Sequence, residues 1–391
     1  MTAIHEHLER LMAQKQVAAL LASIRPEAVL EEAIAIQQIP SPTFHEIARA
    51  SYVLSRFGER RLQDVHIDEV FNVYGRTAGT DPARPGLLIS AHTDTVFGPD
   101  TTLTLARDGD RVCGPGLGDN SLGVAALLAL ADALEQVNFR PACDVWWVAN
   151  TREEGLGDLG GMRSVMTRLK DRLGAALVLE GMGVGRVCYG GIAVRRYKIT
   201  CTGPGGHSWT NFGRPSAIHE LMRLGARLAD LHAPDAPRTS FNIGLIEGGT
   251  SINTIAPEAS LYLDLRSEDA EALAMLERQV GAILGEMRNG DVNFTSELVG
   301  DRPVGQLPLD HWLVQGAGAA LDLVGIEPSY NMASTDANAI LAAGVPAVTL
   351  GITRGGDAHL TSEYIEVTPI AQGLRQAGLV AALALGRLAK P

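Results

Sequence analysis

Short apolar runs and longer stretches of helical periodicity alternate along most of this chain. Runs with little polar interruption predict buried strands at 87–91, 144–149, 175–179 and 345–350. Apolar residues spaced three and four apart predict helices at 5–38, 43–57, 124–134, 311–325 and 369–388. The first helix should break at Arg25-Pro26, and Thr43 and Glu46 have the spacing of a capping box at the start of the second. The alternation predicts an α/β domain whose sheet is covered by helices.

A different pattern occupies residues 192–300. Strands with alternating polar and apolar residues are predicted at 193–202, 239–247, 259–266 and 292–298, with helices at 216–231 and 270–287. The order strand–helix–strand–strand–helix–strand is that of a small α+β unit. We therefore expect one domain made of residues 1–191 and 301–391, into which residues 192–300 are inserted.

Composition and charge narrow the class of protein. The chain has 391 residues, 46% of them hydrophobic, and a formal net charge of −12, which argues against a nucleic-acid partner. The apolar runs at 123–134 and 377–388 are shorter than the roughly 20 residues that span a bilayer, and the first residues do not resemble a signal peptide. Four cysteines without CxxC spacing are typical of a reducing compartment. We expect a cytoplasmic protein that binds neither nucleic acid nor a membrane.

Histidines and carboxylates follow the predicted buried strands or lie in adjoining loops. These candidates are His92, Asp94, Asp119, Glu153, Glu154, Glu180 and His359. Taken singly, each has an ordinary explanation, such as a hydrogen-bonded His–Asp pair, a helix-capping aspartate or a solvated pair of glutamates. Their recurrence at the carboxyl ends of strands, where open α/β sheets build their sites, favours a common centre.

The ligand types indicate which metal this centre would hold. Imidazole and carboxylate ligands without thiolates suit catalytic zinc, with manganese or cobalt as alternatives. Five of these residues are candidate ligands: His92, Asp119, Glu154, Glu180 and His359. Five ligands exceed the need of one tetrahedral ion, so we expect two divalent ions that share one carboxylate. The glycine-rich stretch 114–123 could instead cradle a phosphate, but no lysine follows its glycines and Asp119 would repel the anion.

At these residues the chain resembles the co-catalytic zinc hydrolases that include aminoacylase, acetylornithine deacetylase, succinyl-diaminopimelate desuccinylase, glutamate carboxypeptidase and peptidase T. The resemblance extends from residue 39 to residue 365 and rests on His92-Thr93-Asp94, Gly118-Asp119-Asn120, Glu153-Glu154-Gly155, Gly206-His207-Ser208 and His359. It implies a zinc-peptidase-like catalytic domain with a mixed sheet in three αβα layers. It also implies that the inserted unit is a ferredoxin-like lid through which the protein forms a homodimer.

The resemblance assigns the metal ligands. Asp119 would bridge the two ions, with His92 and Glu180 at one ion and Glu154 and His359 at the other. Glu180 stands where several peptidases of this family have an aspartate, so its ion could be held differently. The resemblance implies zinc as the metal, with manganese or cobalt as alternatives.

The resemblance also assigns the catalytic groups. Asp94 would orient His92, and Glu153 would be the general base that takes a proton from the attacking water and returns it to the leaving nitrogen. Adjacent side chains on an extended segment point in different directions, so Glu154 can bind a metal while Glu153 addresses the water.

Three residues of the inserted unit match substrate-binding positions of the family. His207 would stabilise the oxyanion, in its own subunit or in the partner's site. Asn253 and Arg266, 13 residues apart, would both contact the carboxylate of the substrate. From the residues alone, His207 could equally be a locally bonded turn residue and Arg266 an exposed ion-pair partner.

The sequence leaves both the substrate and the reaction open. The expected one is hydrolysis of the amide bond in a small N-acyl amino acid or short peptide with a free carboxylate. Arg354, in the loop before His359, could recognise a second anionic or nitro group or could face solvent. The first alternative is an aminohydrolase that releases ammonia from a carboxylated amine, such as an aromatic one. The second is a binding homologue without catalytic activity, against which the intact Glu153 counts.

Overall fold

The computed structural model describes residues 3–287 and 292–390, and the chain divides into two compact units. The first unit combines Met1–Gly191 with Gly305–Pro391, and the second is Ile192–Val304. The predicted strand at 292–298 continues as β14 (Asn293–Arg302), so the second unit ends slightly later than the sequence pattern indicated.

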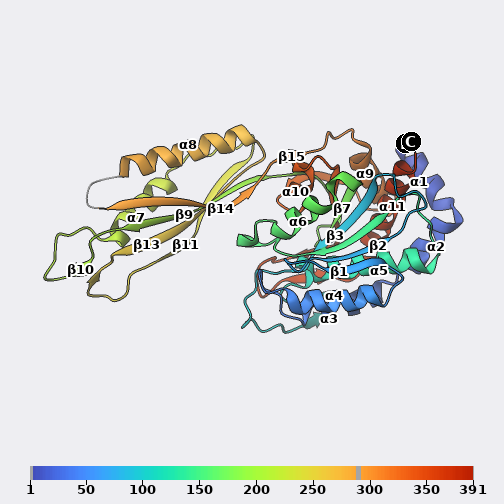
Figure 1. The fold of residues 1–391 in the computed structure, drawn as a ribbon, viewed down its shortest axis with the longest axis horizontal. Coiled ribbons are helices and arrows are strands. Elements are labelled where there is room, and N and C mark those ends of the chain that lie inside the picture. The colour runs from blue at the N-terminus through green and yellow to red at the C-terminus, as the bar shows by residue number, and fades with distance from the viewer. Residues whose placement is uncertain (1–2, 288–291, 391) are drawn as a thin grey trace. The chain divides into compact units, whose positions relative to one another are not determined.

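The first unit is built around a large mixed sheet (Figure 1) with the strand order β1-β2-β6-β3-β7-β17-β8-β15 and with β16 beside β8. The strands are β1 (Gln63–Ile67), β2 (Val73–Thr77), β3 (Gly86–His92), β6 (Val145–Asn150), β7 (Leu173–Met182), β8 (Arg186–Gly191), β15 (Gly305–Gln306), β16 (Ser329–Ala333) and β17 (Ala347–Thr353). The four central strands β6, β3, β7 and β17 are parallel. Every residue of β3, β6 and β17 is buried, which explains why these strands appear as unbroken apolar runs.

Helices cover both faces of this sheet, which gives the three layers expected. Leu87 and Ile89 of β3 belong to one core, whereas Leu88 points to the other, because successive side chains of a strand alternate. The first core is covered by α1 (Ala3–Ala13), α2 (Lys15–Ser23), α3 (Pro26–Gln37), α4 (Ile47–Gly58), α5 (Leu122–Gln136), α9 (Trp312–Leu323) and α11 (Ile370–Leu388). The second is covered by α6 (Gly160–Leu169) and α10 (Ala337–Ala342).

A small second sheet connects loops that are far apart in sequence. Its strands are β4 (Ala106–Asp108), β5 (Arg111–Cys113), β18 (Gly355–Gly356) and β19 (Tyr364–Glu366), in the order β18-β19-β5-β4. Short irregular turns lie at Leu117–Ser121, Gly155–Gly157 and Lys170–Arg172. Because β5 leads into the first of these turns, its pairing with β19 fixes the turn against the C-terminal part of the chain.

The second unit is a four-stranded antiparallel sheet with the order β11-β13-β9-β14. Its elements are β9 (Ala193–Thr202), β10 (Gly206–His207), α7 (Ala217–Ala229), β11 (Thr239–Gly248), β12 (Thr254–Ile255), β13 (Glu258–Ser267), α8 (Ala270–Met287) and β14. Helices α7 and α8 pack on one face, where Leu221 and Leu276 join the core formed by Leu261, Leu263 and Leu265. The short strands β10 and β12 form a separate ladder.

The predicted capping box is wrong, for a reason that bears on function. Helix α4 begins at Ile47, and the cap residue Glu46 makes no capping bond with its side chain. The hydroxyl of Thr43 donates instead to the carboxylate of Asp94 over 2.9 Å. The N-terminal helical stretch also breaks once more than predicted, at Gln14 between α1 and α2.

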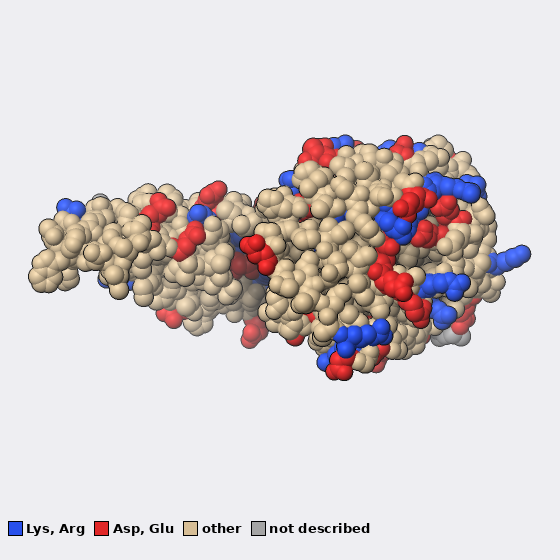
Figure 2. All heavy atoms as spheres, turned by 90° about the horizontal axis from the view of Figure 1, so that it is seen from below, with Lys and Arg blue, Asp and Glu red and all other residues tan. Residues whose placement is uncertain are grey.

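One helical stretch exceeds the length expected from its apolar run. Leu117–Gln136 is long and apolar enough to cross a membrane, but 83% of its most apolar window is buried inside the protein. Burial of this kind is typical of a helix in a protein core. On the face shown in Figure 2, acidic and basic side chains are interspersed over the first unit.

Candidate metal centre

Parallel strands of the large sheet deliver four of the predicted site residues to one edge. His92 is the last residue of β3, and Glu180 lies near the end of the neighbouring β7. Glu153 and Glu154 follow shortly after the end of β6, on the other side of β3. Carboxyl ends of adjacent parallel strands therefore meet here, as the sequence pattern indicated.

Two further ligands approach this edge from loops. Asp119 lies in the turn Leu117–Ser121 at the start of α5. His359 lies between β18 and β19, in the left-handed region with φ +69°. Since β19 pairs with β5, which leads into the turn of Asp119, the small sheet holds both loops in register.

The carboxylate of Asp119 stands between the two predicted histidine ligands. Its Oδ1 lies 3.1 Å from Nε2 of His92, and its Oδ2 lies 3.3 Å from Nε2 of His359. Nε2 of His359 is also 3.3 Å from Oε1 of Glu154, and Nε2 of His92 is 3.6 Å from Oε2 of Glu180. Each oxygen of Asp119 thus faces a separate set of ligands.

These contacts define two candidate metal positions that share Asp119. One ligand atom each from His92, Asp119 and Glu180 lie within 4.8 Å of one another, and so do atoms of Asp119, Glu154 and His359. This division is the one that the family resemblance implied.

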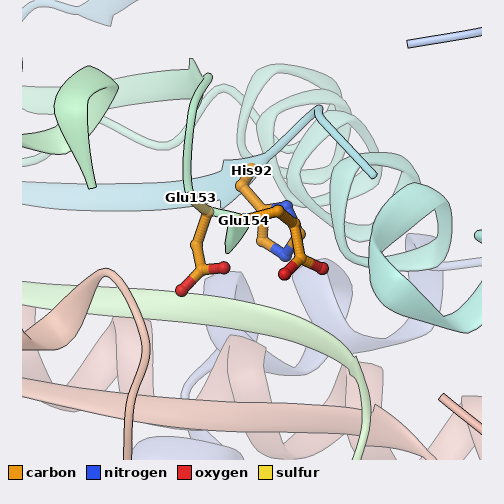
Figure 3. Close-up of side chains that lie close together, drawn as sticks. All are labelled: His92, Glu153 and Glu154. Carbon is orange, nitrogen blue, oxygen red and sulfur yellow. The ribbon is translucent and has the colours of Figure 1, made fainter. Parts of the chain in front are cut away.

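Glu153 adjoins the centre from a different direction. Its carboxylate, that of Glu154 and the imidazole of His92 also offer atoms within 4.8 Å of one another. Figure 3 shows the two glutamate side chains diverging: Glu154 extends in front of the His92 ring, and the carboxylate of Glu153 lies to the side of it. Adjacent carboxylates therefore occupy different parts of the site.

Asp94 is fully buried and organises the residues around it. The His92 Nδ1 lies 3.1 Å from the backbone oxygen of Asp94 and 3.6 Å from its carboxylate. A proton on Nδ1 would leave Nε2 free for a metal. The carboxylate of Asp94 also accepts the backbone N–H groups of Glu153 and Glu154, over 2.9 and 3.0 Å. Asp94 thus supports three site residues, of which the sequence indicated only His92.

The surrounding carboxylates shift the pKa values of both histidines upward. Burial alone would lower the pKa of His92, but Glu180, Asp119 and Asp94 outweigh it and raise that pKa well above its usual value. Hydrogen bonds to Asp119 and Glu154 raise the pKa of His359 to about 10. The same two histidines lower the pKa of Asp119, although burial alone would raise it.

The pKa values of two other ligand carboxyls are raised, in contrast to that of Asp119. Burial, followed by the charge of Asp119, raises the pKa of Glu154 to about 7. Burial also raises the pKa of Glu180 to about 7, against the opposing effect of His92. So many acidic groups close together require compensating positive charge, which protons on the histidines or bound divalent cations supply. The mixture of imidazole and carboxylate donors fits zinc, manganese or cobalt.

The structure adds two buried acids to which the sequence gave no role. Glu363 accepts the backbone N–H groups of Gly118 and Asp119, over 2.7 and 3.0 Å, and burial raises its pKa to about 7. Asp336 accepts a hydrogen bond from the side chain of Asn150 over 2.7 Å, and burial raises its pKa well above the usual value. Both lie in loops or helix starts without hydrophobic periodicity, so no pattern in one sequence marks them.

Two of the predicted substrate-binding residues lie together at one end of the second unit. His207, on β10, stands opposite Thr254 of β12, and the backbone oxygen of Asn253 accepts the N–H of Ser208. Nδ1 of His207 lies 3.2 and 3.4 Å from the backbone nitrogens of Trp209 and Thr210, which donate to it. Acceptance through Nδ1 corresponds to the tautomer that carries its proton on Nε2.

Arg266 lies at the opposite end of the same unit. It is the penultimate residue of β13, opposite Val194, whereas the β10–β12 ladder adjoins the end of β13 that starts at Glu258. Eight residue steps separate Glu258 from Arg266, which is about 26 Å at a rise of about 3.3 Å per residue. Arg266 and the β10–β12 ladder, which begins next to Asn253, therefore lie toward opposite ends of β13.

Two arginines were also predicted to bind substrate, Arg266 in the second unit and Arg354 in the first. Nε of Arg266 donates to Asp264 over 2.6 Å, which is the ion pair considered as an alternative. Arg354 is exposed, directly after β17 in the first unit.

The sequence matches one family of known proteins over most of its length. Residues 88–384 match the model of peptidase family M20/M25/M40. The matched region includes all five predicted ligands and Glu153.

Individual relatives are distant in sequence. The chain is 26% identical over 235 residues to a succinyl-diaminopimelate desuccinylase of Delftia acidovorans, which covers 55% of this chain and 60% of that protein. It is 26% identical over 313 residues to an acetylornithine deacetylase of Klebsiella pneumoniae, covering 74% and 78%. The fold is similar to that of a dipeptidase from Saccharomyces cerevisiae, with a TM-score of 0.77, 15% identity, and coverage of 96% and 99%.

Proposed function

Because this chain belongs to peptidase family M20/M25/M40, we propose that it is a metal-dependent hydrolase of the amide bond in a small, carboxylate-bearing N-acyl amino acid or short peptide. The observation that carries this proposal is the position of Asp119, with one oxygen facing His92 and the other His359. A bridging carboxylate between two ligand sets, with Glu153 beside it, is suited to activating a water molecule. Relatives named as a desuccinylase and a deacetylase support removal of an acyl group from an amino acid.

Two divalent ions, zinc by donor chemistry, would be held by His92, Asp119 and Glu180 and by Asp119, Glu154 and His359. Such ions act as Lewis acids and lower the pKa of water. Glu153 takes the proton from the attacking water and delivers it to the amide nitrogen as the C–N bond breaks. The carboxylate of Asp94 supports this role, because it accepts the backbone N–H groups of both Glu153 and Glu154.

His207 is suited to stabilise the oxyanion of the tetrahedral intermediate. Its Nδ1 accepts backbone N–H groups, which leaves Nε2–H as a donor on an exposed side chain. A neutral imidazole that donates through Nε2 stabilises developing negative charge without first losing a proton.

We further propose that the active protein is a homodimer in which His207 serves the partner's site and in which Asn253 and Arg266 bind the carboxylate of the substrate. Strand β11 supports the dimer itself, because it forms an edge of its sheet and exposes Leu245 and Ile246 at 62% and 61%. An exposed apolar edge strand is a template for pairing with a second copy.

The substrate proposed here carries an apolar group next to the scissile amide. Three exposed apolar side chains each lie within two residues of a site residue. They are Val96, Leu156 and Leu360, with exposed fractions of 41%, 49% and 56%. Ligand sites combine such apolar surface with a few polar groups, so an aliphatic or aromatic acyl group or side chain would be bound more favourably than a charged one.

The test is turnover of N-acyl amino acids, dipeptides, tripeptides and amino-substituted aromatic acids by metal-reconstituted protein, beside the Glu153→Ala variant. Release of a free amino acid by the wild type, lost in the variant, is the expected result. Release of ammonia from an aromatic amine would replace the proposal with the aminohydrolase alternative. No turnover and no metal binding would favour the binding homologue.

A further inference from the structure

The backbone that carries the two catalytic glutamates is held by side chains rather than by secondary structure. After β6 ends at Asn150, four successive backbone N–H groups donate to side-chain oxygens. The donors and acceptors are Thr151 to Asn72, Arg152 to Glu46, and Glu153 and Glu154 to the two oxygens of Asp94. The acceptors come from separate parts of the first unit, so the conformation of this segment depends on tertiary structure.

Glu46 occupies an unusual place in this set. It is fully buried immediately before α4, yet its Oε1 accepts the N–H of Phe44 over 2.9 Å and that of Arg152 over 3.2 Å. Its Oε2 is also buried and has no hydrogen-bond partner among the described residues. A buried carboxyl that neither caps a helix nor pairs with a bonded cation is costly to retain for stability alone.

Arg152 is where the segment most needs support. Its φ of +56° lies in the left-handed region, which residues other than glycine rarely adopt. Such a conformation persists where surrounding contacts determine it, and strained residues of this kind cluster at functional sites. Arg152 directly precedes the proposed general base Glu153. The acceptor for the backbone N–H of Arg152 is Glu46.

We propose that Glu46 is a positioning residue for catalysis: by accepting the N–H of Arg152, it holds Glu153 and Glu154 in their working directions. Glu153 then keeps its reach to the water, and Glu154 keeps its place beside Asp119 and His359. Asn72 is a less selective test of the idea, because its side chain also donates to Asp68 and to the backbone of Gly161. The proposal rests on the proposed function for the roles of Glu153 as base and of Glu154 as metal ligand.

The ionisation of Glu46 fits this role. Burial raises the pKa of its carboxyl, and the nearby charge of Asp94 raises it further, against the backbone hydrogen bonds and Arg152. A carboxyl that readily keeps its proton accepts N–H bonds through its carbonyl oxygen, which a glutamine amide reproduces. Glu46→Gln should therefore preserve the function of the side chain, whereas Glu46→Met removes the acceptor at similar volume.

The experiment compares Glu46→Met with Glu46→Gln in three measurements. Amide hydrogen exchange of residues 151–154 in metal-free protein should accelerate in Glu46→Met and stay at the wild-type rate in Glu46→Gln. In metal titrations, the position that includes Glu154 should weaken by about 10- to 100-fold in Glu46→Met, while the position of His92 and Glu180 changes little. With substrate, kcat should fall by a similar factor and KM should stay nearly constant, because the loss concerns groups acting in the transition state.

The control is Asp81→Ala, which also removes a carboxylate that accepts from two donors. Its Oδ1 accepts the backbone N–H of Ala83 over 3.2 Å, and its Oδ2 accepts from Nε of Arg84 over 3.1 Å, in the turn before β3. It should leave exchange at 151–154, both metal affinities and kcat unchanged. If Glu46→Met does not fold, Glu46→Asp replaces it, because it keeps the carboxyl but shortens its reach to Arg152.

Three results would overturn the proposal. They are unchanged exchange at 151–154 in Glu46→Met, equal weakening of both metal positions, and a Glu46→Gln variant as impaired as Glu46→Met. Exchange and metal binding need no substrate, so they decide the role of Glu46 even if the protein hydrolyses none of the proposed amides.

Discussion

The carboxylate of Asp94 accepts the backbone N–H of Glu153 over 2.9 Å, while its second oxygen accepts that of Glu154 over 3.0 Å. One buried side chain thus fixes the backbone of the proposed base and of a metal ligand at once. Because Asp94 also adjoins Nδ1 of His92, it couples the two proposed metal positions to the base.

Asp94→Asn should be nearly as damaging as Asp94→Ala. The amide keeps the shape of the carboxylate but presents one NH₂ group, which would face a backbone N–H where an acceptor is required. We expect kcat to fall about 100-fold in both variants, because displaced catalytic groups lose their alignment with substrate. Steady-state kinetics with metal at saturation measure this, and an Asp94→Asn variant with wild-type kcat would contradict the arrangement described.

Glu153→Gln should separate catalysis from metal binding. The variant loses the base, so kcat should fall by about 10²- to 10⁴-fold. Metal content should stay at the wild-type level, because both ligand sets are complete without Glu153. Elemental analysis beside kinetics checks both statements. If the variant also lost its metal, Glu153 would be a ligand and another group would have to act as base.

Metal affinity should rise with pH between about 6 and 8. The pKa of Glu154 and that of Glu180 are raised to about 7, and that of His359 to about 10, so these groups carry protons that a metal must displace. Because each folded pKa lies above its unfolded value, the metal-free fold binds extra protons and its stability decreases as pH rises through this window. Calorimetry in buffers of different ionisation enthalpy should detect proton release on metal binding. Uptake of protons would contradict these shifts.

Glu363→Leu should weaken both metal positions together. Glu363 accepts the N–H groups of Gly118 and Asp119, and Asp119 belongs to both ligand sets. We expect about a 10- to 100-fold loss of affinity at each position, in contrast to the selective loss predicted for Glu46→Met. Glu363→Gln keeps one acceptor oxygen and serves as the matched comparison. A loss confined to one position would show that Asp119 is not shared.

Mixing two inactive variants tests whether the partner subunit completes the site. If His207 acts across the dimer, a heterodimer of Glu153→Ala and His207→Ala chains contains one intact site. With random pairing about half of the dimers are mixed, so activity should recover to about one quarter of the wild type. If His207 acts within its own chain, both sites of the heterodimer are defective and no activity should return.

Leu245→Asp on β11 should shift the protein toward the monomer in ultracentrifugation.

The sequence by itself determined the α/β class and the identity of the candidate residues at the sheet edge. Buried parallel strands must be apolar throughout, so β3 and β6 stood out, and the first polar residues after them were conspicuous for the same reason. The alternating pattern of the second unit was visible because antiparallel strands on one layer of helices bury a single face. These signals are local, since they depend on neighbours in the chain.

Only the tertiary structure decided how those residues are held and which of them can act together. Glu46 and Glu363 accept backbone N–H groups from segments 106 and 244–245 residues away, and such partners leave no periodic trace in sequence. The capping-box spacing of Thr43 and Glu46 was a sound local signal, but Asp94 and Arg152 offered both side chains other partners. The position of Arg266 near the end of β13 that is remote from the β10–β12 ladder likewise follows from strand register, which a spacing of 13 residues cannot reveal. Burial makes each unsatisfied backbone group costly, so the fold recruits distant side chains wherever the site interrupts regular structure.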